Sequence, residues 1–281
     1  MCRRLITAVI TVCLAGVPSI YSQTTLPTQS QQEAKKELDE AARSYREAQF
    51  EDAQRHSERA LTLDPDNKTA PVFIARTIHA QFKRGDFTPQ NIARAQDAIA
   101  AYQRVLSKDP QNEEAYKAIA WIYSQLKEDD LLQNWVLQRA SDGSIDKEKR
   151  SEAYVVLASK QWDCSFKFTE LPTHKTTTSG SLGVIVKYYK SDDEVAFENA
   201  RQCALRGLEL ADLAISLKDV SESAWSYKTN LLLELSKFAE MSGDVQQTAD
   251  FQRQYKAALK ETTKLAKARE EMEKRDAKDD R

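Results

Sequence analysis

Small and branched residues recur along the chain at the spacing expected for packed helices. In the segment 53–67 a small residue is followed seven positions later by another, and the sequence Asp-Pro-Asp-Asn comes next. The segment 98–112 repeats this order with Ala98, Val105 and Asp-Pro-Gln-Asn. Residues seven apart share one face of a helix, small residues let two helices approach closely, and proline stops a helix. Each segment is therefore predicted to be a helix that ends before its proline.

Matching apolar patterns follow these turns. An aromatic, a branched aliphatic and a small residue lie at helical spacing in 114–123 and again in 152–158, and Ala224-Trp225 begins a third such segment. This spacing places the three residue types on one helical face. The chain is therefore expected to alternate first and second helices over most of its length.

These residues resemble the tetratricopeptide repeat (TPR). Its pattern has an aromatic residue, Leu-Gly and Tyr in the first helix, and Ala, Phe, Ala and Pro in the second helix and its turn. The resemblance implies an all-α fold, a right-handed α-solenoid of about five TPR-like helix pairs over residues 33–262, with a small hairpin or loop insertion in the fourth. The third pair departs from the pattern, because Leu132, Val136 and Arg139 stand where the family has Ala, Phe and Ala.

The composition changes within the array over about residues 164–194. Phe166 and Phe168 alternate with polar residues, a polar stretch follows at 172–181, and every second residue of 184–188 is again apolar. A period of two is typical of strands, so we expect a β-hairpin on the side of the solenoid. The alternative is a longer first helix followed by a loop.

The N-terminal segment has the layout of a secretory signal. Arg3 and Arg4 precede an apolar stretch over 5–17, and polar residues follow. We expect a signal peptide over 1–22 and hence a periplasmic or extracellular protein; the alternative is an uncleaved N-terminal anchor. The next residues, 23–32, are polar and without periodicity, which predicts a flexible linker.

The C-terminal residues 263–281 alternate basic and acidic side chains. Pairs at three- and four-residue offsets would support a solvated helix, but a fraying, disordered tail is the expected outcome.

The charge balance narrows the class of partner. Lys and Arg number 41 against 43 Asp and Glu, so the chain has no basic excess of the kind that binds nucleic acid. After the first segment no apolar run reaches the roughly 18 residues of a membrane span. The expected partner is therefore a protein or peptide, with no nucleic acid and no integral membrane span after signal cleavage.

Two cysteines remain once Cys2 and Cys13 leave with the signal. Cys164 and Cys203 fall on neighbouring predicted helices. In an oxidising compartment such a pair is a candidate disulfide. The alternative is two separate buried thiols.

No residue pattern indicates catalysis. The three histidines, His56, His79 and His174, lie far apart and in no metal-ligand spacing. Nucleophile-elbow and phosphate-loop motifs do not occur. We therefore predict no metal, no cofactor and no enzymatic activity.

The resemblance implies where a partner would bind. In the TPR family the first helices line a concave groove, and ligands lie there. The residues that this register places in the groove are Tyr45 and Arg46, Arg76 and His79, Trp121 and Gln125, Trp162 and Asp163, and Asn230. The alternative for both tryptophans is packing between neighbouring helices.

Two functions follow from these expectations. The first is a non-catalytic interaction scaffold of the cell envelope or extracellular space that binds a protein or peptide in its groove. The alternative is an envelope-assembly or structural component that docks on a protein or membrane through the 164–194 insertion, using Phe166, Phe168, Val184 and Tyr188.

Overall fold

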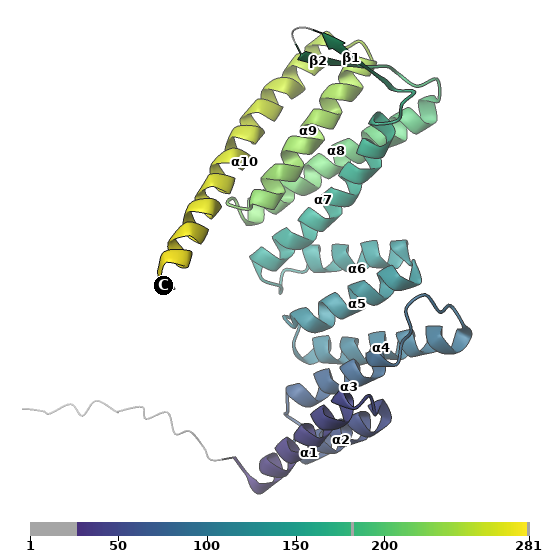
Figure 1. Cartoon of the computed structure of the whole chain (residues 1–281), viewed down its shortest axis with the longest axis vertical. Coiled ribbons are helices and arrows are strands. Elements are labelled where there is room, and N and C mark those ends of the chain that lie inside the picture. Colours follow the sequence, from purple (N-terminus) through teal and green to yellow (C-terminus); the bar gives the residue numbers. More distant parts are fainter. Residues whose placement is uncertain (1–26, 181–182, 280–281) are drawn as a thin grey trace, which may run out of the picture.

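The computed structural model describes residues 27–180 and 183–279, so the predicted signal peptide lies outside the described part. This part consists of ten helices and one hairpin (Figure 1). The helices are α1 (Gln29–Arg46), α2 (Phe50–Leu63), α3 (Thr69–Ala80), α4 (Pro89–Lys108), α5 (Glu113–Leu126), α6 (Asp129–Ser141), α7 (Lys147–Thr169), α8 (Glu194–Leu217), α9 (Glu222–Met241) and α10 (Val245–Asp279). The strands are β1 (Lys175–Gly180) and β2 (Gly183–Tyr188).

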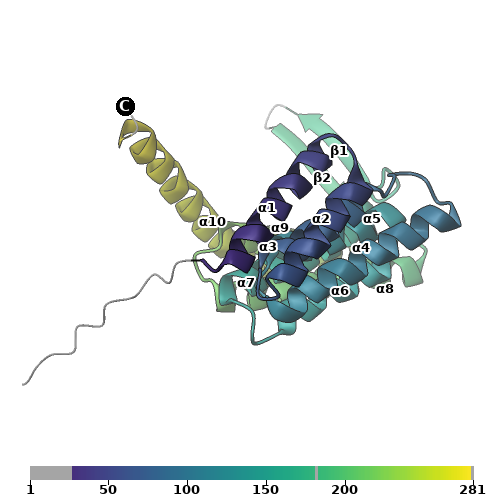
Figure 2. The ribbon, with the colours of Figure 1, turned by 90° about the horizontal axis from the view of Figure 1, so that it is seen from below.

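Each helix packs against the next one along the chain, which gives five stacked pairs from α1–α2 to α9–α10 (Figure 1). Figure 2 looks along this array from its α1–α2 end. The predicted all-α solenoid of about five helix pairs is therefore confirmed.

The small residues lie where helices approach most closely. Ala53, Ala60 and Ala98 have no exposed surface, and Val105 is almost fully buried. In the fourth pair glycine takes this role: a Cβ on Gly207 would lie 2.6 Å from the Cδ2 atom of a buried leucine on α9. Helices can pack this closely only where the contact residues are small, as the sequence pattern predicts.

The Asp-Pro-x-Asn turns end one helix and begin the next. The side-chain oxygen of Asn67 accepts hydrogen bonds from the backbone N–H groups of Thr69 and Ala70, each at 2.9 Å. In the next turn Asn112 accepts from the N–H of Ala115 at 3.0 Å. Both asparagines thus satisfy N–H groups that a helix start leaves unpaired.

The first helix begins earlier than expected. The side chains of Thr28 and Gln31 form a reciprocal capping box, and α1 starts at Gln29. The predicted linker over 23–32 is therefore wrong for its last residues, which are helical, while residues 23–26 lie outside the described part.

The last helix is also longer than expected. Helix α10 continues to Asp279, so the tail predicted to be disordered from residue 263 is helical as far as it is described. Arg269 pairs with Glu273 one turn further along α10 and with Glu222 on α9, both at 2.9 Å. These pairs, together with the lack of glycine or proline in this segment, account for its helical state.

The insertion is a hairpin, as expected, but it is shorter than the 164–194 segment. Phe166 and Phe168 lie in the last turns of α7 rather than in a strand, because Phe168 packs into a core cluster with Phe197 and Phe238. The two strands pair antiparallel from Lys175 opposite Tyr188 to Gly180 opposite Gly183. Tertiary burial here overrides the alternating pattern.

Candidate functional site

A strip of aromatic and polar side chains runs across the first helices of the first three pairs. Tyr45 comes from α1, Phe73, Arg76 and His79 come from α3, and Trp121 comes from α5. We call these five residues the first-helix strip. Four of them were predicted groove residues, and Phe73 is added by the structure.

Ring contacts join the strip from helix to helix. The rings of Tyr45 and Phe73 meet edge to face with centroids 5.7 Å apart, and those of His79 and Trp121 lie 5.0 Å apart. The Arg76 guanidinium lies 6.0 Å from the centre of the Phe73 ring. Such contacts favour well-ordered side chains over freely rotating ones.

Arg76 is also tied to α5. Its guanidinium donates two hydrogen bonds to the carboxylate of Glu114. These hydrogen bonds raise the pKa of Arg76 further above its usual range. The strip therefore presents a fixed, charge-balanced pair beside its rings rather than a free cation.

His79 lies half-buried in the middle of the strip. Its Nδ1 atom is 3.2 Å from the hydroxyl of Tyr102, and its ring also contacts that of Trp121. Burial lowers the pKa of His79 below its ordinary value. At neutral pH the imidazole is therefore uncharged and takes part in the aromatic contacts.

Acidification should destabilise the fold through His79. Because its pKa is lowered in the folded chain, the unfolded chain binds this proton first, and the free energy of unfolding falls as the pH drops below about 6.5. Urea unfolding at about pH 8 and about pH 5 measures this for the wild type and for His79→Gln. The wild type is expected to lose more stability on acidification than the variant. An equal loss of stability in the wild type and in His79→Gln would contradict this role of His79.

The other predicted groove residues form a separate group or stand alone. Trp162 on α7 packs against Phe166 at 4.8 Å and lies 6.1 Å from Tyr227 on α9. In the described part of the chain no aromatic contact links Trp162 to the first-helix strip. The remaining predicted residues lie as follows: Arg46 is exposed at the end of α1, Gln125 donates to Ser124 at 3.2 Å, Asp163 pairs with Lys167 at 2.6 Å, and Asn230 is half-buried on α9.

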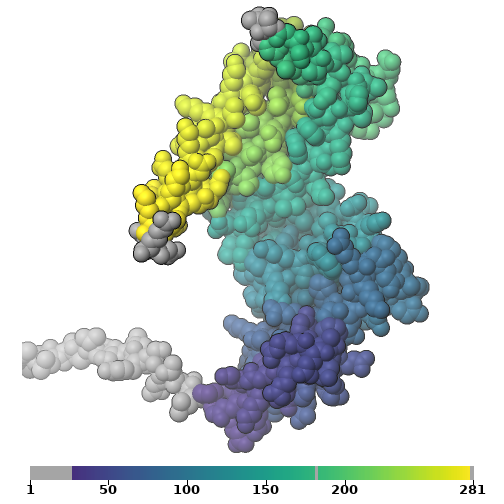
Figure 3. Space-filling view, in the orientation of Figure 1, coloured from purple at the N-terminus to yellow at the C-terminus, as the bar shows by residue number. Residues whose placement is uncertain are grey.

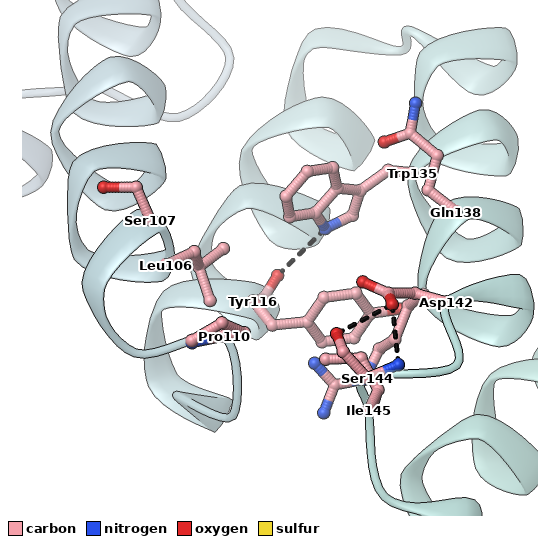
Figure 4. Close-up of a pocket in the computed structure, with 10 residues that line it drawn as sticks. Leu106, Ser107, Pro110, Tyr116, Trp135, Gln138, Asp142, Ser144 and Ile145 are labelled. Carbon is pink, nitrogen blue, oxygen red and sulfur yellow. Dashed lines mark hydrogen bonds between the residues drawn. The ribbon is translucent and has the colours of Figure 1, made fainter.

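The structure also contains a pocket that the groove register does not include. It has a volume of about 320 Å³ and lies between the end of α4, the start of α5 and the end of α6. Figure 4 shows Leu106 and Pro110 on one side, Trp135 on the other and Tyr116 between them. The wall combines these apolar side chains with the polar side chains of Ser107, Gln138, Asp142 and Ser144.

A buried arginine forms part of the pocket wall. The side chain of Arg139 is only 5% exposed, it pairs with Glu113, and its guanidinium lies 3.9 Å from the centre of the Tyr116 ring. Burial raises the pKa of Tyr116 to about 12, so this phenol stays neutral. The Arg139 guanidinium is thus held by the Glu113 carboxylate and the Tyr116 ring.

One sequence signal points to this pocket. Arg139 stands where the other second helices have Ala60, Val105 and Ala214, all of them buried. Arg139 is far larger than these residues and lines the pocket. The departure from the family pattern in the third pair therefore coincides with the pocket.

The described residues contain no group of three or more His, Cys, Asp or Glu side chains that could hold a metal ion. The strip offers aromatic faces, the Arg76–Glu114 ion pair and the uncharged imidazole of His79. Aromatic side chains with hydrogen-bonding groups beside them are common at protein–protein interfaces.

The evidence for helical repeats comes from the chain itself. No protein-family model matches the chain, and no curated protein sequence matches it. Paired helices, buried alanines and capped Asp-Pro-x-Asn turns nevertheless recur in the chain itself. The fold is of tetratricopeptide type.

Solved structures of TPR proteins are similar to this chain only in outline. MamA shares 14% sequence identity over 84% of this chain and 95% of its own, with a TM-score of 0.35. YrrB, a TPR protein with an unusual peptide-binding site, shares 16% over 70% and 93%, with a TM-score of 0.32. A TPR protein from Parabacteroides merdae shares 13% over 83% and 98%, with a TM-score of 0.34. At these TM-scores the assignment rests on the TPR-like array of this chain itself.

Proposed function

We propose that this chain is a non-catalytic interaction scaffold that binds a peptide segment of a partner protein along the first-helix strip. The observation that supports it best is the placement of Trp121, which is 41% exposed while its ring contacts those of His79 and Phe82. Large aromatic residues that stay open to solvent on an ordered surface are typical anchors of protein recognition.

The chemistry of the strip defines the kind of segment that it fits. The half-buried rings of Tyr45 and Phe73 and the open face of Trp121 offer apolar contact, while the Arg76–Glu114 pair and His79 offer hydrogen-bonding groups between them. An extended or helical peptide with apolar side chains at its two ends and polar ones between would match this order.

The proposed setting is the periplasm or the extracellular space. The signal-like layout of residues 1–22 supports it, and so does the disulfide between Cys164 and Cys203, because structural disulfides are rare in the cytosol. The described helices include none that is long and apolar enough to cross a membrane.

Removal of the exposed indole should weaken partner binding. Trp121→Ala is expected to lower the affinity of a partner isolated from the native envelope fraction by about thirtyfold, the effect of losing about 2 kcal/mol at an interface anchor. Pull-down with the mature chain, read by mass spectrometry and followed by titration of the partner, measures this.

Leu137→Ala is the matched control. Leu137 on α6 is exposed to a similar degree as Trp121 but lies on a second helix, outside the strip. Partner binding should be unchanged in this variant. Equal binding by the wild type and Trp121→Ala would refute recognition through the strip.

A further inference from the structure

The last helix of the array carries a row of lysines on the side turned away from its neighbour. Helix α10 is the outermost layer and packs against α9 (Figures 1 and 3). The side that faces α9 contains Ala258, which is almost fully buried, and Thr262, whose hydroxyl oxygen lies 3.0 Å from that of Thr229. Arg269 lies on the same side and pairs with Glu222 on α9. These contacts fix which face of α10 is open to a partner.

Six lysines share this open face. They follow one another three, four or seven positions apart, a spacing that keeps side chains on one side of a helix, and all of them are exposed. The only carboxylate on this face of the described helix is that of Glu271. The row is about 33 Å long. We call it the basic ridge, and it consists of Lys256, Lys260, Lys264, Lys267, Lys274 and Lys278.

The positive charges of the ridge are poorly compensated within the fold. Lys264 pairs with Glu261 at 3.0 Å, but among the described residues no ion pair involves Lys256, Lys260 or Lys267. The first three lysines of the ridge also follow one another at four-residue intervals, and like charges at this spacing destabilise a helix. A face that only had to be solvated would carry both signs in alternation. Carboxylates of a partner would relieve this repulsion.

The surroundings of the ridge favour a narrow partner. With 3.6 residues per turn, Glu261 lies to one side of the ridge and Glu270 to the other. A lipid bilayer or a nucleic-acid duplex is broad enough to meet these carboxylates as well, and they would repel its phosphates. A single polypeptide segment is narrow enough to contact the lysines alone. Leu259 and Thr263 line a shallow hollow beside four of the lysines, and this hollow offers apolar contact to such a segment.

The composition of the ridge disfavours single-stranded nucleic acid, which is equally narrow. Proteins that bind single strands stack the bases on aromatic side chains. No aromatic residue occurs from Lys256 to Lys278, and the chain as a whole has a net charge of −2. The remaining narrow polyanion is a segment of protein rich in Asp and Glu.

We propose that the basic ridge binds an acidic segment of a partner protein laid along α10. Carboxylates of this segment pair with Lys256, Lys260 and Lys267, and its apolar groups contact Leu259 and Thr263. Each exposed ion pair contributes little by itself, so binding depends on several pairs that form together and weakens as the salt concentration rises. The ridge is a second interaction surface, because it shares no residue or helix with the first-helix strip.

Fluorescence anisotropy with a labelled peptide of about ten glutamates, which spans the ridge when extended, tests the proposal. The chain from Gln23 onward, which retains every described residue, serves as the wild type. We expect binding that weakens with salt, and at least about a tenfold loss of affinity when Lys260→Glu is combined with Lys267→Glu. The change at position 260 replaces repulsion along α10 by attraction, so it should not unfold the helix. Thermal melting verifies this.

Lys35→Glu combined with Lys36→Glu is the matched control. Both lysines are exposed on α1, at the other end of the array, and the net charge changes by the same amount as in the ridge variant. The control should bind the glutamate peptide like the wild type. No binding by the wild type, or an equal loss in the two variants, would overturn the proposal.

Two other probes distinguish the class of partner. A single-stranded oligonucleotide of equal charge and vesicles of phosphatidylglycerol should each bind the ridge more weakly than the glutamate peptide does. Tighter binding of either one would overturn the assignment to an acidic protein segment. Trp121→Ala should bind the glutamate peptide like the wild type, so the outcome is independent of recognition through the first-helix strip.

Discussion

Glu234→Ala is expected to lower the free energy of unfolding by about 3–5 kcal/mol, because it leaves a buried ammonium without its nearest partner. The side chains of Glu234 and Lys237 on α9 are only 2% and 7% exposed, and Lys237 Nζ donates to Glu234 at 2.7 Å and to Glu170 at 3.0 Å. Although burial opposes it, these carboxylates hold the pKa of Lys237 above its ordinary value. Urea unfolding at neutral pH measures the loss.

Two further variants identify the cause of that loss. Glu273→Ala removes a carboxylate from the exposed pair with Arg269 and should lower the free energy of unfolding far less than Glu234→Ala, because solvent screens this pair. Glu234→Leu combined with Lys237→Met removes both buried charges and keeps the volume, and should be far less harmful than Glu234→Ala. Thr169 retains the carbonyl of Phe166 as an acceptor in that variant. Equal destabilisation by the single and the double variant would contradict the burial argument.

Loss of the disulfide is the second large effect expected. The bridge joins Cys164 on α7 to Cys203 on α8 and closes a loop of 39 residues. By the loop-closure relation, Cys164→Ser with Cys203→Ser should lower the free energy of unfolding by about 4 kcal/mol. Thermal melting or urea unfolding under oxidising conditions measures this.

Reducing agent distinguishes a lost bridge from damaged packing. It should lower the melting temperature of the wild type toward that of the double serine variant and leave the variant itself unchanged. Hydrogen exchange should rise most in the end of α7 and the first half of α8, which the bridge joins. A wild type that melts at the same temperature with and without reductant would contradict a structural role for the bridge.

The strip and the pocket differ in how many of their residues the sequence predicted. Tyr45, Arg76, His79 and Trp121 were found from the repeat register, because one position in each unit faces one surface of a regular array. Phe73 was missed, since it lies between register positions and joins the strip through contacts with its neighbours. The pocket was missed because Arg139, one of its lining residues, departs from the repeat pattern on which the register rests.

In the hairpin region the sequence pattern predicted too much strand. The alternation of apolar and polar residues predicted the strand at 184–188, but it also predicted a strand around Phe166 and Phe168. A period of two does not reveal which residues a neighbouring helix will bury. Phe168 is drawn into the core by Phe197 and Phe238, and this contact extends α7 to Thr169.

The sequence by itself determined the helix pairs, their small contact residues and their turns, because helical periodicity, close packing and capping by Asn67 and Asn112 act between residues near one another in the chain. Only the tertiary structure decided which side chains meet across helices. The Arg76–Glu114 pair, the buried Glu234–Lys237 pair and the outward face of Ile185 all depend on distances between elements far apart in sequence. Those distances are set by how each pair stacks on the next, which no local pattern encodes.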